Sequence, residues 1–165
     1  MPDAYPSSTA VAPAPPGDEP ATDPHAVFAA FHEASLWPGL GRTTGSRLAA
    51  AGITLPEHVD LGRLGQVEGV SGPRARRLAD SFRAAAGTYA VVELLVGAGL
   101  PARLARAATE RLGPNAADDL RTDPWALLTA DAEIGQADRF ARMRGRQRDD
   151  PLRGPAVLAH LLARA

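Results

Sequence analysis

The chain of 165 residues is 45% hydrophobic and 22% charged, with a formal net charge of −1 at pH 7, which suits one folded domain or two small helical ones. It contains neither cysteine nor lysine, and all 18 basic residues are arginine. Disulfides, thiolate metal sites, a Walker A nucleotide-binding loop and lysine-based covalent catalysis are therefore excluded. We expect no enzymatic activity, no cofactor and no metal in this chain. No apolar run approaches the roughly 20 residues of a membrane span and no signal peptide is recognisable, so we expect a cytoplasmic protein without membrane contact.

The first 24 residues, MPDAYPSSTAVAPAPPGDEPATDP, are rich in proline, alanine, serine and threonine. Such a segment buries too little apolar surface to offset its ordering entropy, so residues 1–24 are predicted to be a disordered tail. Residues 1–26 hold four acidic residues and no arginine, residues 27–86 seven arginines against five acidic residues, and residues 87–165 eleven against ten. The remainder is thus mildly basic, which permits nucleic-acid binding without proving it.

From His25 onward, apolar residues recur at helical spacing, and no alternating run of strand length appears. Short breaks that contain glycine or proline separate these stretches. The pattern predicts an all-α fold of many short helices. The periodic sets are Val27, Phe28 and Phe31; Ala75, Leu78, Ala79 and Phe82; Val91, Val92, Leu94 and Leu95; Leu104, Ala107, Ala108 and Leu112; Phe140 and Met143; and Val157, Leu158, Leu161 and Leu162.

A repeat becomes visible when GLGRTTGSRLAAAGI (39–53) is aligned with GVSGPRARRLADSFR (69–83) at an offset of 30 residues. Both copies read glycine, an aliphatic residue, a small residue, and then an amphipathic stretch with matching small and apolar positions. Val59, Leu61 and Leu64 form a short apolar helix before the second copy. Helix, glycine turn and helix, occurring twice, indicate tandem helix-hairpin-helix motifs, and we assign residues 25–86 to them as a DNA-binding domain.

The physical chemistry of this motif suggests a phosphate site. Glycine supplies a backbone with positive φ and lets another backbone come close, and the aliphatic residue fills the gap between the helices. The following helix start presents free N–H groups and the positive end of its dipole to a phosphate oxygen. Such contacts bind DNA backbone independently of base sequence and weaken with salt. The residues predicted to contact DNA are Gly39, Leu40, Gly41, Arg42, Arg47, Gly69, Val70, Ser71, Gly72, Arg74, Arg76 and Arg77.

A simpler interpretation of each copy is an ordinary helix start. On that interpretation Arg76 pairs with Asp80 one turn further along the helix. A single turn would favour this alternative, whereas two aligned turns, each followed by a basic amphipathic helix, favour the hairpin interpretation.

From about Leu36 to its end, the chain resembles the N-terminal region of RecD-like ATP-dependent DNA helicases. The resemblance lies in five blocks that follow one another in the family's order. They are GVSGPRARRLADSF (69–82), VVELLVGAGLPARLARAATERLG (91–113), DLRTDPWALL (119–128), QADRFARMRG (136–145) and DDPLRGPAVLAHLL (149–162).

The resemblance implies that residues 87–165 are a further helical domain with a third hairpin. It also implies a non-motor part of a helicase that binds duplex or single-stranded DNA and acts in DNA unwinding, repair or recombination. ATP and Mg²⁺ would belong only to the motor domains of a full-length relative. The motor domains or another protein are the other partners that it implies.

The chain departs from the family's pattern at three points. The family's Gly-Ile-Gly turn of the third hairpin falls at Asp131-Ala132-Glu133, so we predict that this hairpin keeps its packing and has lost phosphate binding. Ser71 replaces the second glycine of the second hairpin, and a one-residue adjustment toward Gly72 is expected to compensate. The sequence stops before any motor, which leaves open whether it is part of a helicase or a separate protein.

Two other functions stay open. Degenerate hairpins could serve as a helical scaffold for protein interaction with little DNA binding, which the third hairpin favours. A glycosylase of the helix-hairpin-helix type would need a catalytic lysine or a suitable aspartate after the hairpin, and only Asp80 is near.

The remaining candidates favour structural roles. No second ligand pair completes a metal site with His25 and His32, and His58 and His160 lack a nucleophile. The acidic residues 118, 119 and 123 fit a solvated helix end, and Trp37 and Trp125 fit the core. The arginines of ARMRGRQR (141–148) suit a helix C-terminus, with an auxiliary DNA contact as the alternative.

Overall fold

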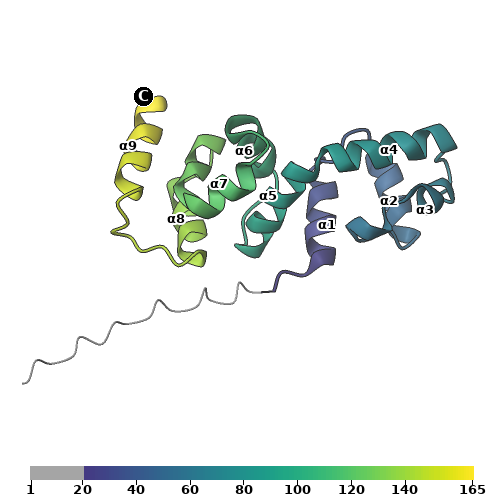
Figure 1. Ribbon diagram of the computed structural model, residues 1–165, viewed down its shortest axis with the longest axis horizontal. Helices are drawn as coiled ribbons and strands as arrows, with labels where there is room; N and C mark the ends of the chain where they lie inside the picture. Colours follow the sequence, from purple (N-terminus) through teal and green to yellow (C-terminus); the bar gives the residue numbers. More distant parts are fainter. Residues whose placement is uncertain (1–20) are drawn as a thin grey trace, which may run out of the picture.

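The computed structural model describes residues 21–165, and this part of the chain folds into helices without a strand (Figure 1). The predicted all-α fold is confirmed; the predicted disordered tail lies almost wholly outside the described residues. No helix in the described range is long and apolar enough to cross a membrane. The elements are α1 (Pro24–Glu33), α2 (Arg42–Ala50), η1 (Pro56–His58), α3 (Leu61–Gly65), α4 (Gly72–Ala84), α5 (Ala86–Gly97), α6 (Leu104–Leu112), α7 (Ala116–Thr122), η2 (Pro124–Ala130), α8 (Ile134–Met143) and α9 (Arg153–Ala163).

Helices α2, α3 and α4 form one end of the elongated molecule, and α9 lies at the other end (Figure 1). Helices α1 and α5 stand between these ends. Local sequence fixes several boundaries, since Asp23 and Asp60 each accept a hydrogen bond from a backbone N–H at the start of α1 and α3. The short apolar helix predicted before the second glycine turn is α3.

The main hydrophobic core contains residues of every α-helix from α1 to α8. Five aromatic rings pack at the junction of α1, α4 and α5, with Tyr89 5.2 Å from Phe31 and 5.7 Å from Phe82 between ring centroids. Trp37 lies 4.8 Å from Phe82 and is buried, as predicted. Because these contacts cross residue 86, the hairpin region is held against the helices that follow it; the boundary between the two assigned domains stays a prediction.

A second, smaller core joins η2, α8 and α9. It consists of Trp125, Leu128, Ala137 and Ala141, with Val157 of α9 packed against it. Trp125 is buried, as predicted, and its Nε1 donates to Asp138 at 3.1 Å. Asp138 also accepts two hydrogen bonds of 2.8 Å from Arg153. One carboxylate therefore ties the three elements together.

Candidate nucleic-acid interface

The two predicted glycine turns adopt the same backbone conformation. Gly39 has a φ of +81° and Gly69 a φ of +80°, and both are exposed. The next residue in each turn points inward: Leu40 is half-buried and Val70 is buried. The N–H of this residue donates to the carbonyl oxygen three residues earlier in both copies, at 3.3 Å from Leu40 and at 3.0 Å from Val70. The structure thus confirms the positive φ and the inward aliphatic residue predicted for both hairpins.

The helix after each turn begins at the equivalent residue. Gly41 and Ser71 are the N-caps of α2 and α4, with φ and ψ of −81° and 162° in the first and −70° and 161° in the second. The expected one-residue adjustment toward Gly72 is therefore wrong. Ser71 fits without it because this position has an extended backbone that any residue adopts, and its hydroxyl caps the helix.

The two helix starts differ in how many backbone N–H groups they offer. In α2 the N–H groups of Arg42 and Thr43 have no hydrogen-bond partner within residues 21–165, as is usual in a first helical turn. In α4 the Ser71 hydroxyl accepts from the N–H of Arg74 at 3.4 Å, and Pro73 has no N–H. The first hairpin is therefore the richer in backbone donors.

The hairpins are fastened to each other through polar contacts. Nε1 of Trp37 donates to the carbonyl oxygen of Leu78 at 3.1 Å, and Oγ of Ser81 donates to that of Pro38 at 2.8 Å. In the opposite direction, Nη1 of Arg47 donates to the carbonyl oxygen of Glu68 at 3.2 Å. The turn of each hairpin consequently rests on the second helix of the other.

The guanidinium group of Arg74 lies between the two hairpins. Its Nη2 donates to Oγ1 of Thr44 at 3.0 Å, and its Nη1 lies 3.5 Å from the carbonyl oxygen of Gly69. Thr44 is the buried polar residue of α2, 8% exposed. Sequence reasoning missed Thr44 and Ser81, although a hydroxyl at a buried position of an amphipathic helix is a signal that a polar partner faces it.

The arginines of the predicted interface form no ion pair with a described residue. Within residues 21–165 no ion pair involves Arg42, Arg47, Arg74, Arg76 or Arg77. Asp80 pairs with Arg83 at 3.1 Å, so the alternative pairing with Arg76 is not formed. Five of the predicted DNA contacts therefore keep their positive charge uncompensated by a neighbouring carboxylate.

The third hairpin keeps the geometry of the first two without glycine. Asp131 has a φ of +60°, Ala132 is completely buried, and Glu133 is the N-cap of α8. The N–H of Glu133 donates to Oε1 of Gln136 at 2.9 Å, which closes a capping box. The predicted retention of packing is confirmed. Two exposed carboxylates stand where the first two hairpins present glycine or serine, and the loss of phosphate binding stays a prediction.

A fourth turn lies between α5 and α6. Gly99 has a φ of +66°, and buried Leu100 donates its N–H to the carbonyl oxygen of Leu95 at 2.8 Å. It separates the two helices formed by the block VVELLVGAGLPARLARAATERLG (91–113).

The other candidate sites do not assemble. No group of three or more histidine or acidic residues in the described range could hold a metal ion. His25 contacts Thr54 at 3.1 Å, and His160 contacts the carbonyl oxygen of Leu128 at 3.2 Å. Arg146 donates to the carbonyl oxygen of Thr122 at 2.6 Å and pairs with Asp150, so it is engaged within the fold.

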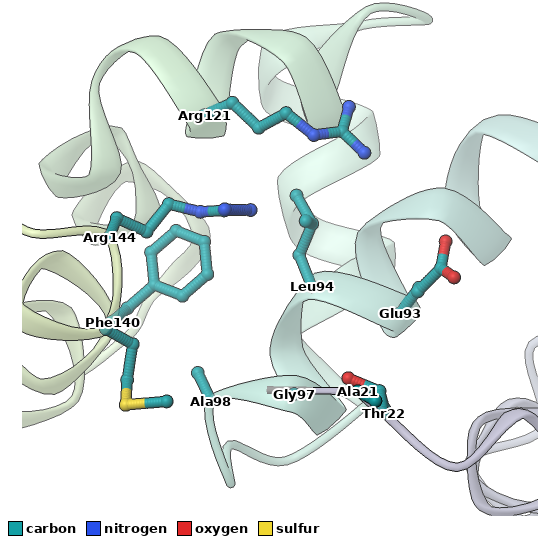
Figure 2. A pocket seen from close by; sticks show the side chains of 10 residues that line it. Ala21, Thr22, Glu93, Leu94, Gly97, Ala98, Arg121, Phe140 and Arg144 are labelled. Atoms are coloured by element: carbon teal, nitrogen blue, oxygen red, sulfur yellow. The ribbon is translucent and has the colours of Figure 1, made fainter. Parts of the chain in front are cut away.

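A hollow of about 320 Å³ lies between α5, α7 and α8 (Figure 2). Figure 2 shows the Arg144 side chain reaching over the Phe140 ring, 5.5 Å from its centroid, into this space. The side chain of Thr22 covers Gly97 at its edge. Sequence reasoning does not predict this hollow, because residues from three helices and the N-terminal segment line it.

Comparison with known proteins identifies one region. Residues 84–165 match the family described as ATP-dependent RecD2 DNA helicase HHH domain, where HHH denotes helix-hairpin-helix. The match begins at the last residue of α4 and includes α5 to α9 with the third hairpin. The tandem hairpins lie before it. Neither a curated protein nor a solved structure matches the chain.

Proposed function

Because residues 84–165 belong to the helix-hairpin-helix domain of ATP-dependent RecD2 DNA helicases, we propose that the whole chain is a DNA-binding module that grips the sugar-phosphate backbone through its two tandem hairpins. In this proposal it is the non-motor part of such a helicase and acts beside the motor domains in unwinding, repair or recombination in the cytoplasm. ATP and Mg²⁺ bind to the motor domains.

The duplicated turn is the observation that carries this proposal. Gly39 and Gly69 hold the same left-handed conformation 30 residues apart, and both turns are exposed next to arginines that have no carboxylate partner among residues 21–165. Exposed backbone donors and uncompensated guanidinium groups are complementary to phosphates and carry no base-reading chemistry. Binding is accordingly independent of base sequence and falls with salt.

Fluorescence anisotropy with a short labelled duplex and a labelled single strand tests the proposal. Binding is measured in a salt series from about 50 to about 200 mM, where log K falls with a slope of about −0.9 per phosphate neutralised on duplex DNA. The wild-type chain is expected to give the same slope for unrelated base sequences.

Gly39→Ala and Gly52→Ala form a matched pair for this test. Gly39 and Gly52 have φ values of +81° and +79°, and a Cβ on either would meet nothing within 4 Å. Both substitutions cost about 1 kcal/mol of folding stability. Only Gly39→Ala is expected to weaken DNA binding, by about tenfold for one lost contact of about 1.4 kcal/mol. A salt-independent wild type, or equal binding by both variants, contradicts the proposal.

A protein-interaction scaffold is the second candidate, and α9 carries the observation that favours it. Leu158, Leu161 and Leu162 are 59%, 53% and 68% exposed on this helix. Exposed leucines on one terminal helix are typical of a surface that packs against another protein. Absence of DNA binding in the salt series, together with a folded wild type, would favour this function.

A further inference from the structure

The repeat makes Arg47 of α2 and Arg77 of α4 equivalent, because they lie 30 residues apart in the alignment that superposes Gly39 on Gly69. The carbonyl groups that precede these glycines, those of Pro38 and Glu68, are equivalent by the same offset. Each accepts a hydrogen bond from the second helix of the other hairpin, at 2.8 Å from Ser81 and at 3.2 Å from Arg47. The exchange between hairpins is therefore reciprocal.

A guanidinium group of the first hairpin lies against the second turn. Nη1 of Arg47 lies so close to Gly69 that a Cβ built on this glycine would stand 2.5 Å from it. Arg47 is exposed and donates to an uncharged carbonyl oxygen. Its charge is thus placed over the second turn and stays available to an anion.

Two arginines of the second hairpin border the first turn. A hollow of about 320 Å³ beside Gly39 is lined by Pro38, Arg74, Arg77 and Ser81. Arg77 is exposed, and within the described residues it has no ion-pair partner. The equivalent of Arg47 therefore borders the equivalent turn.

We infer that the two hairpins exchange their phosphate-binding arginines: Arg47 completes the site at the second turn, and Arg77 completes the site at the first turn. The ligand at each site is a phosphodiester of the nucleic-acid backbone, which a planar guanidinium binds through two parallel N–H groups. Each site is then formed by both hairpins together. This inference rests on the proposed function, and it adds which arginine binds phosphate at which turn.

The two sites are unequal in their backbone donors. At the second turn Pro73 lacks an N–H and that of Arg74 is occupied by Ser71, which leaves the N–H of Gly72 without a partner among the described residues. The guanidinium groups of Arg47 and Arg74 therefore supply most of the donors there. At the first turn the N–H groups of Arg42 and Thr43 share the task with Arg77. Loss of Arg47 is consequently expected to weaken binding more than loss of Arg77.

Arg47→Gln, Arg77→Gln and the control Arg83→Gln test the contribution of each charge. Arg83 is 72% exposed on α4 and is paired with Asp80, so its removal takes the same charge from the same region without touching either turn. In the salt series, Arg47→Gln and Arg77→Gln are each expected to reduce the steepness of the salt dependence by about one. Arg47→Gln is expected to lower affinity about tenfold and Arg77→Gln about threefold, with Arg83→Gln unchanged. A merely structural role of Arg47 would lower the melting temperature and leave the salt slope as in the wild type.

Double-mutant cycles test the exchange itself, since they detect coupling between groups that share a site. Arg47→Gln with Gly69→Ala, and Arg77→Gln with Gly39→Ala, are expected to be non-additive in DNA affinity. Arg47→Gln with Gly39→Ala, and Arg77→Gln with Gly69→Ala, are expected to be additive. Coupling within the same hairpin, or salt slopes equal to wild type in both arginine variants, overturns the exchange while the proposed function stands. A wild type that shows no salt-dependent binding overturns both.

Discussion

Nη2 of Arg74 donates to Oγ1 of Thr44 over 3.0 Å, across the contact between the two hairpins. Thr44 is buried in α2, and its hydroxyl is the side-chain acceptor that holds this guanidinium between the turns. The same arginine approaches the carbonyl oxygen of Gly69 at 3.5 Å. One buried hydroxyl therefore positions a cation that the proposed DNA interface uses.

Thr44→Val is expected to loosen the contact between the hairpins. The substitution keeps the volume and removes the acceptor, at a cost of about 1 kcal/mol for one part-buried hydrogen bond. We expect the melting temperature to fall by about 2 to 4 °C and DNA affinity to fall with little change in salt slope, because Arg74 keeps its charge. Circular dichroism and the anisotropy assay measure both effects.

Thr43→Val is the matched control for this change. Thr43 is the neighbouring exposed residue of α2, and its hydroxyl forms no hydrogen bond within the described part of the chain. Equal melting temperatures for the two variants would show that the bond between Arg74 and Thr44 contributes nothing to stability.

Replacing the acidic residues of the third turn is expected to create a phosphate contact. Asp131→Gly supplies a residue suited to the φ of +60°, and Glu133→Ser copies the cap that Ser71 provides in the second hairpin. Together they remove two carboxylates from the N-terminus of α8. The double variant should bind DNA more tightly and with a salt slope steeper by about one.

Glu93→Gln together with Glu110→Gln removes two exposed carboxylates elsewhere in the same region and serves as the control. An equal gain in both double variants would mean that net charge alone causes the effect.

Asp131→Gly by itself should raise the free energy of unfolding by about 0.5 kcal/mol, because the relief of left-handed strain exceeds the added chain entropy of glycine.

The turns could be predicted from sequence because their determinants are local. Glycine at Gly39 and Gly69 indicates positive φ, and the aliphatic residue after it indicates the inward position. The third turn, which lacks glycine, is located by the family resemblance at Asp131-Ala132-Glu133. The cap at Ser71 is also open to prediction from sequence, since serine is a preferred N-cap.

The exchange between hairpins could not be predicted in the same way. The bond from Arg47 to Glu68 depends on how two helix pairs pack, and neither residue differs by type from other surface arginines and glutamates. The contact of Phe31 with Tyr89 likewise joins residues from separate periodic segments, which a helical pattern assigns to a buried face without naming the partner.

Asp138 is expected to make the end of the molecule around α8 and α9 sensitive to acid. Its hydrogen bonds with Arg153 are the main reason that the pKa of Asp138 is lowered, with Trp125 as a further donor. A carboxyl with a lowered folded pKa stabilises the fold above its unfolded pKa of about 3.9 and loses this contribution as pH falls through the folded value. Stability of this end should therefore decline below about pH 4.

Trp125 fluorescence in a Trp37→Phe background reports this loss, because Trp125 donates to the same carboxylate. Asp138→Asn should lower stability at neutral pH by about 1 to 2 kcal/mol and flatten its acid dependence. The control Asp118→Asn breaks an exposed pair with Arg121 and should change stability by less than about 0.5 kcal/mol. If the stability of Asp138→Asn declined below about pH 4 as much as that of the wild type, Asp138 would not be the group responsible for the acid sensitivity.

The phenol of Tyr89 is expected to lose its proton at an unusually high pH. Burial, followed by the charges of Glu93 and Glu57, raises the pKa of Tyr89 to about 12. A Tyr5→Phe variant leaves Tyr89 as the only tyrosine, so absorbance of the phenolate reports it alone. Because the folded pKa lies above the unfolded value of about 10, the folded state holds this proton more tightly, and stability falls as pH rises from about 10 to about 12. Tyr89→Phe should remove this part of the alkaline decline and Glu93→Gln should lower the pKa, whereas a phenolate that appears near pH 10 in the folded chain would show that Tyr89 is open to solvent.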